Sequence, residues 1–461
     1  MSKVAFLIVF IVAGCSYLPA IGPNYKAVQL DVPTAYREAA SISTTTSVQP
    51  YWERLGDPTL TTLAQKALSQ SLTLKQAWQR IKQTRAASGM AMAALGPQVQ
   101  GQGGYQGQRI GAQANLVNGT TQTLDIYSAG VGANWELDIF GGNRRALEGA
   151  WARTEAAEAA ANAMSSALLA EVARQYLTFR ALQQQVVFAQ QQVSSTAALA
   201  TLVGHQARVG VADGAMLAQA QAREAASRMA LAPLQAAVSA AQYQLESVLG
   251  EKPGSLAEVL AQPVPLPAVP TSSTLVLPSE LILQRPDLKM REREAAAATA
   301  AIGVAMADLF PRFSLTGSFG VQGPNPTMLD HPTALVWNGG PSFRWALFAS
   351  GQIWNNVNLH KAKQREAVLA YQQAALDALA EVESNLARHH AATQALQAGA
   401  ALAQASAKQA HLATLQHAKG AINGLMWHEA LLAQAQGEQA ATQAHVNALL
   451  AYVQLHQSLG L

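Results

Sequence analysis

The chain has 461 residues, of which 50% are apolar and only 13% are charged, against roughly 25% charged residues in soluble globular proteins. Its net charge of +3 is too small to favour nucleic acid as a partner, and no run of ~18 apolar residues beyond the N-terminus predicts a transmembrane helix. The sequence contains neither a nucleophile–base arrangement nor a phosphate-binding loop, so it predicts no enzyme active site, no catalytic residue and no cofactor.

The first residues have the pattern of a secretory signal, with Lys3 before an apolar core at residues 4–12. The core ends in Val12-Ala13-Gly14-Cys15, which resembles a bacterial lipobox. This resemblance implies a signal peptide of residues 1–14, a diacylglycerol on Cys15 and, because Ser16 follows, sorting to the outer membrane as a lipid-anchored protein. An ordinary signal peptide with an incidental cysteine is the alternative. Since Cys15 is the only cysteine, an internal disulfide is excluded.

The rest of the chain contains an internal duplication. Gly210, Gly214 and Met216 recur at one constant offset as Gly420, Gly424 and Met426, and Trp135 recurs at the same offset as Trp345. A second set recurs at an offset four residues longer: Leu74, Gly89, Met92, Leu95, Pro97 and Gly103 match Leu288, Gly303, Met306, Leu309, Pro311 and Gly317. Chance matches are common in Ala-rich helices, but Gly, Pro, Trp and Met in one register indicate a repeat.

Each repeat predicts the same order of elements. A helical stretch (about 58–95 and 286–309) precedes a Gly-rich region (97–142 and 311–351). A long stretch follows (144–203 and 352–419) that contains no Pro and, apart from Gly149 and Gly399, no Gly, and ~60 helical residues form a rod of about 90 Å. A turn at Gly210 or Gly420 reverses the chain into a second helix, which ends near residue 250 or 459, and Pro233 should kink the first of these. The Pro-rich residues 252–278 predict an irregular crossover.

The Gly-rich regions predict four strands. Residues 131–139 and 312–321 alternate between apolar and polar side chains, five glutamines between Gln98 and Gln108 share one parity, and residues 342–347 supply the fourth strand. Period-two alternation places the apolar groups on one face and the polar groups on the other. This pattern is typical of a membrane β-barrel with a wet interior, and a soluble sheet with one buried face is the alternative. Four strands cannot close a membrane barrel, so the barrel interpretation requires an oligomer.

The chain resembles the TolC/OprM-type outer-membrane efflux channels, in particular the NodT-like lipoproteins, over nearly its whole mature length. The most specific motifs are Trp135-Glu136-Leu137-Asp138-Ile139-Phe140-Gly141 and Arg285-Pro286-Asp287, with Gly22-Pro23-Asn24-Tyr25 near the N-terminus. The resemblance implies an α+β membrane protein: a homotrimer with a twelve-stranded transmembrane barrel continuous with a twelve-helix periplasmic tunnel. The sequence departs from the family pattern at Phe348-Ala349-Ser350-Gly351, where the family usually has Phe-Asp-Gly-Gly. It also departs at Gln284, where the family often has an Arg before Arg285.

The same resemblance implies domain bounds and partners. After the signal peptide come a lipid-anchored segment (15–57), the first repeat (58–250), an equatorial crossover (251–285) and the second repeat (286–461). The partners implied are a periplasmic adaptor protein, an inner-membrane transporter of the RND type and outer-membrane lipid. We expect passive export of drugs or other small toxic compounds. A type I secretion exit duct and a structural envelope lipoprotein are the alternatives.

The two helix-reversing turns are implied to lie at the periplasmic end, where they meet the adaptor and form the gate. The tip residues are Arg208, Val209, Gly210, Val211, Ala212, Asp213, Lys419, Gly420, Ala421, Ile422 and Asn423. The family gate often uses a Leu and, one helical turn later, an Asp that points into the pore, and the matching positions here are Leu425 and Glu429. A solvated Glu429 and plain turn residues at Asp213 and Asn423 are the alternatives. Seven of the ten histidines lie between His389 and His456, but their spacing fits no metal-ligand motif, so no metal site is expected.

Overall fold

A computed structural model describes residues 19–30, 32–33, 36–37, 50–114, 120–270 and 279–460, and Cys15 with the signal peptide lies outside them. The chain divides into two compact units, each built from parts of both repeats. Unit 1 comprises Met1–Gln29, Gln79–Glu158 and Met290–Gln372, and unit 2 comprises Leu30–Trp78, Ala159–Lys289 and Gln373–Leu461.

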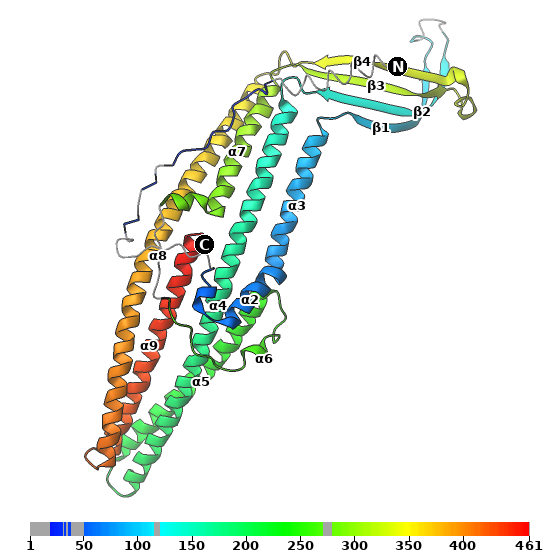
Figure 1. The fold of residues 1–461 in the computed structure, drawn as a ribbon. Coiled ribbons are helices and arrows are strands. Elements are labelled where there is room, and N and C mark those ends of the chain that lie inside the picture. The colour runs from blue at the N-terminus through cyan, green and yellow to red at the C-terminus, as the bar shows by residue number, and fades with distance from the viewer. Residues whose placement is uncertain are drawn as a thin grey trace. The chain divides into compact units, whose positions relative to one another are not determined.

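The described helices and strands follow the repeated order that the sequence predicts (Figure 1). The elements are η2 (Glu53–Leu55), α2 (Pro58–Gln70), α3 (Leu72–Ala93), β1 (Gln98–Ile110), β2 (Gln122–Leu137), α4 (Gly142–Arg208), α5 (Gly214–Leu249), α6 (Ala257–Leu260), η3 (Ser279–Gln284), α7 (Pro286–Ala307), β3 (Arg312–Gly323), η4 (Pro326–Met328), η5 (Pro332–Ala334), β4 (Leu335–Arg344), α8 (Gln352–Ala418) and α9 (Gly424–Ser458). The long uninterrupted helices are confirmed, because α4 and α8 each contain 67 residues. Helix α5 continues through Pro233.

Unit 1 contains an antiparallel sheet with the strand order β1-β2-β3-β4, and Figure 1 shows the four strands side by side. The register pairs Val99 with Ala133, Trp135 with Leu315, and Phe319 with Trp337. Strands β1 and β4 form the two edges, so among the described residues each pairs with one strand only.

Three predicted boundaries were wrong. The fourth strand runs from Leu335 to Arg344 rather than over 342–347, and Pro341 is tolerated there because an edge strand can leave a backbone position without a donor. Strand β2 begins at Gln122 and ends at Leu137 rather than spanning 131–139. The first helical stretch is divided at Ser71, whose ψ of 125° ends α2.

Small residues on α4 and α7 let these two helices pack closely in unit 1. Ala296 and Ala297 of α7 pack with Ala152 of α4, and all three are buried. A Cβ placed on Gly142 would lie 3.0 Å from the Cβ of Ala307. The short connections next to these helices meet through the rings of Phe140 and Phe310, which stack at 4.7 Å.

Unit 2 is built around an apolar core supplied by η2, α2, α4, α5, α6 and α9. Its largest fully buried side chains include Tyr51, Tyr176, Phe179 and Tyr452. Asp57 joins α2 to this core, because its Oδ1 accepts hydrogen bonds from the first backbone N–H groups of α2 and its Oδ2 accepts one from Tyr176 Oη at 2.7 Å. A carboxylate at this position satisfies N–H groups that a helix leaves unpaired.

The crossover between the repeats is held by charged groups of unit 2. Arg285, in the Arg285-Pro286-Asp287 motif, contacts Asp287 at 2.8 Å and Glu381 at 3.0 Å, and donates to the carbonyl of Ser458 at 2.6 Å. Burial acts to raise the pKa of Asp287, but the hydrogen bond and charge of Arg285 outweigh it, so the pKa is lowered. Arg285 thereby ties the start of α7 to α8 and to the end of α9.

Candidate functional site

The sheet has one apolar and one polar face, as the period-two pattern predicts. Val99, Val131, Phe319, Trp337 and Phe343 share one face, because the register places residues of the same parity opposite each other across all three strand pairs. Trp337 is 76% exposed and Val99 68% exposed, so the described residues leave this face open. The other face carries the following polar side chains: Gln98, Gln100, Gln102, Asn134, Ser314, Thr316, Ser318 and Asn338.

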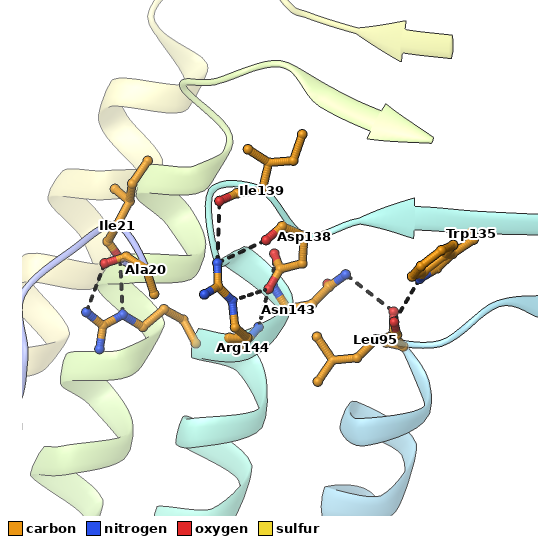
Figure 2. A network of polar contacts seen from close by, with 10 residues as sticks. Ala20, Ile21, Leu95, Trp135, Asp138, Ile139, Asn143 and Arg144 are labelled. Atoms are coloured by element: carbon orange, nitrogen blue, oxygen red, sulfur yellow. Dashed lines mark hydrogen bonds and ion pairs between the residues drawn. The ribbon is translucent and has the colours of Figure 1, made fainter. Parts of the chain in front are cut away.

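A polar network holds the point where β2 passes into α4 (Figure 2). The Asp138 carboxylate accepts hydrogen bonds from the backbone N–H groups of Asn143 (3.0 Å) and Arg144 (2.9 Å) and from Arg144 Nε (3.1 Å). The Arg144 guanidinium also donates to the carbonyl oxygens of Asp138 and Ile139. One carboxylate thus satisfies two of the four free N–H groups at the start of α4. Its negative charge is also stabilised there by the positive end of the helix dipole.

The repeated tryptophans make the same contact in both repeats. Trp135 Nε1 donates to the carbonyl of Leu95 at 2.8 Å, and Trp345 Nε1 donates to the carbonyl of Leu309 at 3.1 Å. Both acceptors lie two residues after the end of a helix, in the short connection to the next strand. Each tryptophan therefore ties the end of one strand to the connection that precedes the neighbouring strand. The carboxylate is not repeated, because Phe348 occupies the position equivalent to Asp138.

Residues 19–29 form a strap that crosses α4 and α7 in unit 1. Arg145, which is 5% exposed, donates to the backbone carbonyls of Ile21 and Gly22 and to Asn24 Oδ1 at 2.7 Å. The strap comes so near α7 that a Cβ on Gly22 would lie 2.5 Å from Gly303 Cα. Cys15, the predicted lipidation site, lies outside the described residues, a few residues before this strap.

The two predicted tip turns have matching geometry in unit 2. Gly210 and Gly420 have φ values of +73° and +70°, a left-handed conformation that glycine adopts without a steric penalty. The Asp213 side chain accepts from Met216 N at 2.7 Å, and that of Asn423 accepts from Met426 N at 2.9 Å. These two residues therefore cap α5 and α9, consistent with their interpretation as turn residues.

The remaining predicted tip residues lie in or next to these turns. Arg208 is the last residue of α4 and hydrogen-bonds the ring of His205. Val209 and Val211 are more than 70% exposed. Ala212 packs against the buried cluster of Leu199, Ala200, Val203 and Ala220. The other members, Lys419, Ala421 and Ile422, lie in the second turn.

The predicted gate residues lie on the first turns of α9. Leu425 is partly buried against a cluster formed by Leu199, Ala200 and Val203 of α4 and Ala220 of α5, so it joins the two helical hairpins within one chain. Glu429 is exposed, one helical turn farther along, and shares a hollow of about 560 Å³ with Arg223 of α5. A Cβ on Gly424 would lie 2.5 Å from Leu202 Cδ2, so the start of α9 tolerates no larger residue there without a shift.

Four of the histidines at positions 389–456, His389, His417, His428 and His456, contact aromatic rings. Tyr452 and His456 lie next to each other at a ring distance of 4.1 Å, and Trp427 contacts both His417 (4.9 Å) and His428 (4.8 Å). Among the described residues, no group of three or more His, Cys, Asp and Glu side chains could hold a metal ion. No helix in the described ranges is long and apolar enough to cross a membrane.

Sequence reasoning missed Arg145 as an anchor of the N-terminal segment. The motif Gly22-Pro23-Asn24-Tyr25 was identified, but its partner lies more than a hundred residues away in sequence. The sequence shows only an arginine at the start of a long Ala-rich helix, and an arginine at such a position can equally be solvated.

Comparisons with known proteins agree with this geometry. The model of the outer membrane efflux protein family matches residues 63–251 and 277–461. Nodulation protein T of Rhizobium leguminosarum bv. trifolii is 26% identical, with 82% of this chain and 79% of that protein covered. ArpC, an antibiotic efflux pump outer membrane protein of Pseudomonas putida, is 27% identical, with coverages of 98% and 93%. The solved structure of the outer-membrane channel OprN has a TM-score of 0.87 at 29% identity, covering 95% of this chain and 98% of that one.

Proposed function

Because the chain belongs to the outer membrane efflux protein family, it is the outer-membrane exit channel of a tripartite efflux pump and no enzyme, and we propose that it acts as a homotrimer. The observation that carries this proposal is the two-faced sheet with open edges at β1 and β4. An open edge is not stable in lipid, and about eight strands are the minimum for a membrane barrel. Three copies supply twelve strands, with apolar side chains toward lipid and glutamines toward a wet pore.

The long helices support a tunnel continuous with this barrel. Four of them, α4, α5, α8 and α9, are paired into two hairpins in each chain, so three copies give twelve helical rods. We propose that the tunnel lies in the periplasm, with the turns at Gly210 and Gly420 contacting the adaptor protein. The inner-membrane transporter is proposed to be of the RND type. Since ArpC is named for antibiotic efflux, small toxic compounds are the proposed cargo, conducted passively.

We infer that Leu425 and Glu429 contribute to the periplasmic gate. Leu425 holds α9 against the first hairpin, so displacing it would release the second hairpin. Glu429 follows on the exposed surface, and three copies of this carboxylate would form a negative ring that attracts cations.

The N-terminal strap supports a lipid anchor at Cys15. Only four residues separate Cys15 from Ala20, whose carbonyl contacts Arg145 in unit 1. An extended chain spans at most ~3.3–3.6 Å per residue, so the attachment point of an acyl chain at Cys15 would lie within about 18 Å of Ala20. Unit 1 also contains the sheet, so an anchor there would be held near the proposed barrel.

Native mass spectrometry of the full chain in detergent tests the assembly directly, with circular dichroism to verify the β signal. The expected result is a trimer, with no folded monomer. Insertion into planar bilayers should then give ion conductance. A stable monomer with intact β signal would contradict the barrel, and a trimer without conductance would favour the structural envelope lipoprotein.

A further inference from the structure

Two arginines lie opposite each other at one end of the polar face of the sheet. Arg312 is the first residue of β3 and Arg344 is the last residue of β4, and the register pairs them directly. Both have the parity of Ser314 and Ser342, so they belong to the face that carries the polar side chains. Strand β3 follows α7 and strand β4 leads to α8, so this is the end of the sheet where the helices begin.

The same position of the first repeat carries neutral amides. The offset that relates the two prolines before the hairpins relates Gln98 to Arg312. The offset of the repeated tryptophans relates Asn134 to Arg344. Gln98 and Asn134 are also directly opposite each other. The two hairpins therefore share one geometry, and the second carries two positive charges where the first carries none.

This pair of like charges is unfavourable for the sheet itself. Directly opposite residues of antiparallel strands have Cβ atoms only ~4.5–5.5 Å apart, and like charges there are destabilising. The amides of the first repeat show that the hairpin forms without arginine at this position. The second hairpin thus carries a cost that the fold does not require, which favours a role for the arginines in binding a negative group.

The carboxylates of the chain offset the charge of only one arginine. Arg312 forms an ion pair with Asp308, which follows the end of α7, and its Nη1 lies 3.9 Å from Glu136 Oε1 of β2. Among the described residues, no carboxylate forms an ion pair with Arg344, whose side chain is exposed. Arg312 is therefore held in place by its partners, whereas the guanidinium of Arg344 is available to a ligand.

Assembly does not bring a counter-charge from the other open edge of the sheet. Strand β4 is one edge and β1 is the other. Residues 72–110, which include α3 and β1, contain lysines and arginines but no Asp and no Glu. In the proposed trimer this segment cannot neutralise Arg344. Three such guanidinium groups would then surround the wet pore at the end of the barrel.

We propose that Arg312 and Arg344 bind the oxyanion group of a solute, a carboxylate, phosphate or sulfate, as it enters the barrel. A guanidinium is always charged and presents its N–H donors in a planar fork that matches two oxygens of such a group. Arg344 makes this contact, and Arg312 adds a second positive charge beside it. The inference rests on the proposed exit channel and deepens it, because it assigns the cargo an anionic group.

The exposure of both side chains suits a site that a solute has to leave again. The side chain of Arg312 is 57% exposed, so water competes for its donors and screens its charge. Conduction requires binding that is favourable enough for entry and weak enough for release. A buried arginine pair would hold an oxyanion more tightly and would slow its exit.

Planar-bilayer recordings of the full chain test the site, with inorganic phosphate as the probe at constant ionic strength. Phosphate should lower the chloride conductance of the parent protein, because a bound oxyanion occupies the site. In Arg344→Gln the phosphate concentration needed for half of this effect should rise about tenfold, a factor that corresponds to ~1.4 kcal/mol. Arg344→Lys keeps the charge but loses the fork, so it should keep the reversal potential in a KCl gradient while losing most of the phosphate effect.

Arg109→Gln is the matched control. Arg109 is exposed and lies on β1 with the parity of Val99, so it belongs to the apolar face of the same sheet. This change removes one positive charge per chain and should leave the effect of phosphate unchanged. If Arg344→Gln fails to assemble, Arg344→Asn, which introduces the amide of the first repeat, serves for the same measurement.

Two results would overturn the site and leave the channel intact. One is conductance with the same phosphate dependence in the parent and in Arg344→Gln. The other is an equal loss of the phosphate effect in Arg109→Gln, which would show that only the overall charge of the barrel matters. A parent protein that inserts without conductance would contradict the proposed function itself.

Discussion

Replacing Asp138 by Asn should loosen the start of α4, since this carboxylate accepts three hydrogen bonds there. Its side chain is only 12% exposed and that of Arg144 is 23% exposed, so solvent screens the pair weakly. Hydrogen bonds to charged groups contribute ~1.5–3 kcal/mol each, and loss of a helix cap costs ~0.5–2 kcal/mol. Because Asn retains one acceptor oxygen and the three bonds share one group, we expect a net loss of about 2 kcal/mol.

Hydrogen exchange measured by mass spectrometry reports this loss locally. About 2 kcal/mol corresponds to roughly 30-fold faster exchange of the Asn143 and Arg144 amides, at ~1.4 kcal/mol per factor of ten. Glu158→Gln is the matched control, because it removes an ion pair with Arg85 whose side chains are 43% and 64% exposed, and such pairs contribute ~0–1 kcal/mol. Equal exchange in Asp138→Asn and the parent protein would refute the conclusion that this carboxylate holds the helix start.

Three further predictions concern unit 2, the tip and the anchor. Burial and the nearby Arg54 lower the pKa of His456 to about 4, although the hydrogen bond to the Tyr452 carbonyl opposes the shift. Because His456 in the unfolded chain takes up a proton near pH 6.5, the free energy of unfolding should fall by about 3 kcal/mol between pH 6.5 and pH 4. Thermal melts of His456→Phe should show a weaker fall over the same pH range. Glu429→Gln should reduce cation preference in planar-bilayer recordings, and Leu425→Ala should raise resting conductance; unchanged selectivity would place the Glu429 side chain away from the pore. Cys15 should incorporate a clickable fatty acid in Gram-negative cells, with the label lost in Cys15→Ala; an unlabelled parent protein would exclude the lipobox.

Much of the architecture could be predicted because the relevant signals are local. Gly210 and Gly420 end long stretches without proline, and both turns occur where they were expected. The alternation around Trp135 and Phe319 likewise predicted which side chains share a face of the sheet, and the register confirms it.

The predicted bounds of β2 and β4 were wrong because the local sequence pattern and the backbone pairing of these strands differ. At the start of β2, Leu124 and Ile126 have the opposite parity to Tyr127 and Ala129, so strict alternation begins only farther along the strand. In β4, consecutive apolar residues followed by Gly339-Gly340-Pro341 indicate a turn in the sequence, yet backbone pairing with β3 holds this segment extended. The contacts of Arg145 could not be predicted, because they depend on how distant segments meet.

Each repeat passes from a strand to a long helix, β2 into α4 and β4 into α8, and these two junctions differ in what covers them. The first is completed within one chain, so glycine and alanine at Gly142, Gly149 and Ala300 bring two backbones together during folding. At the second junction the described residues leave a hollow of about 830 Å³ along the start of α8, which the proposed trimer would cover only on assembly. The counterparts of Gly142, Gly149 and Ala300 are Gln352 and Leu359 on α8 and Ala86 on α3, and all three are exposed. Close packing of small residues therefore marks the junction that is completed within the chain, and exposed counterparts mark the junction that the described residues leave uncovered.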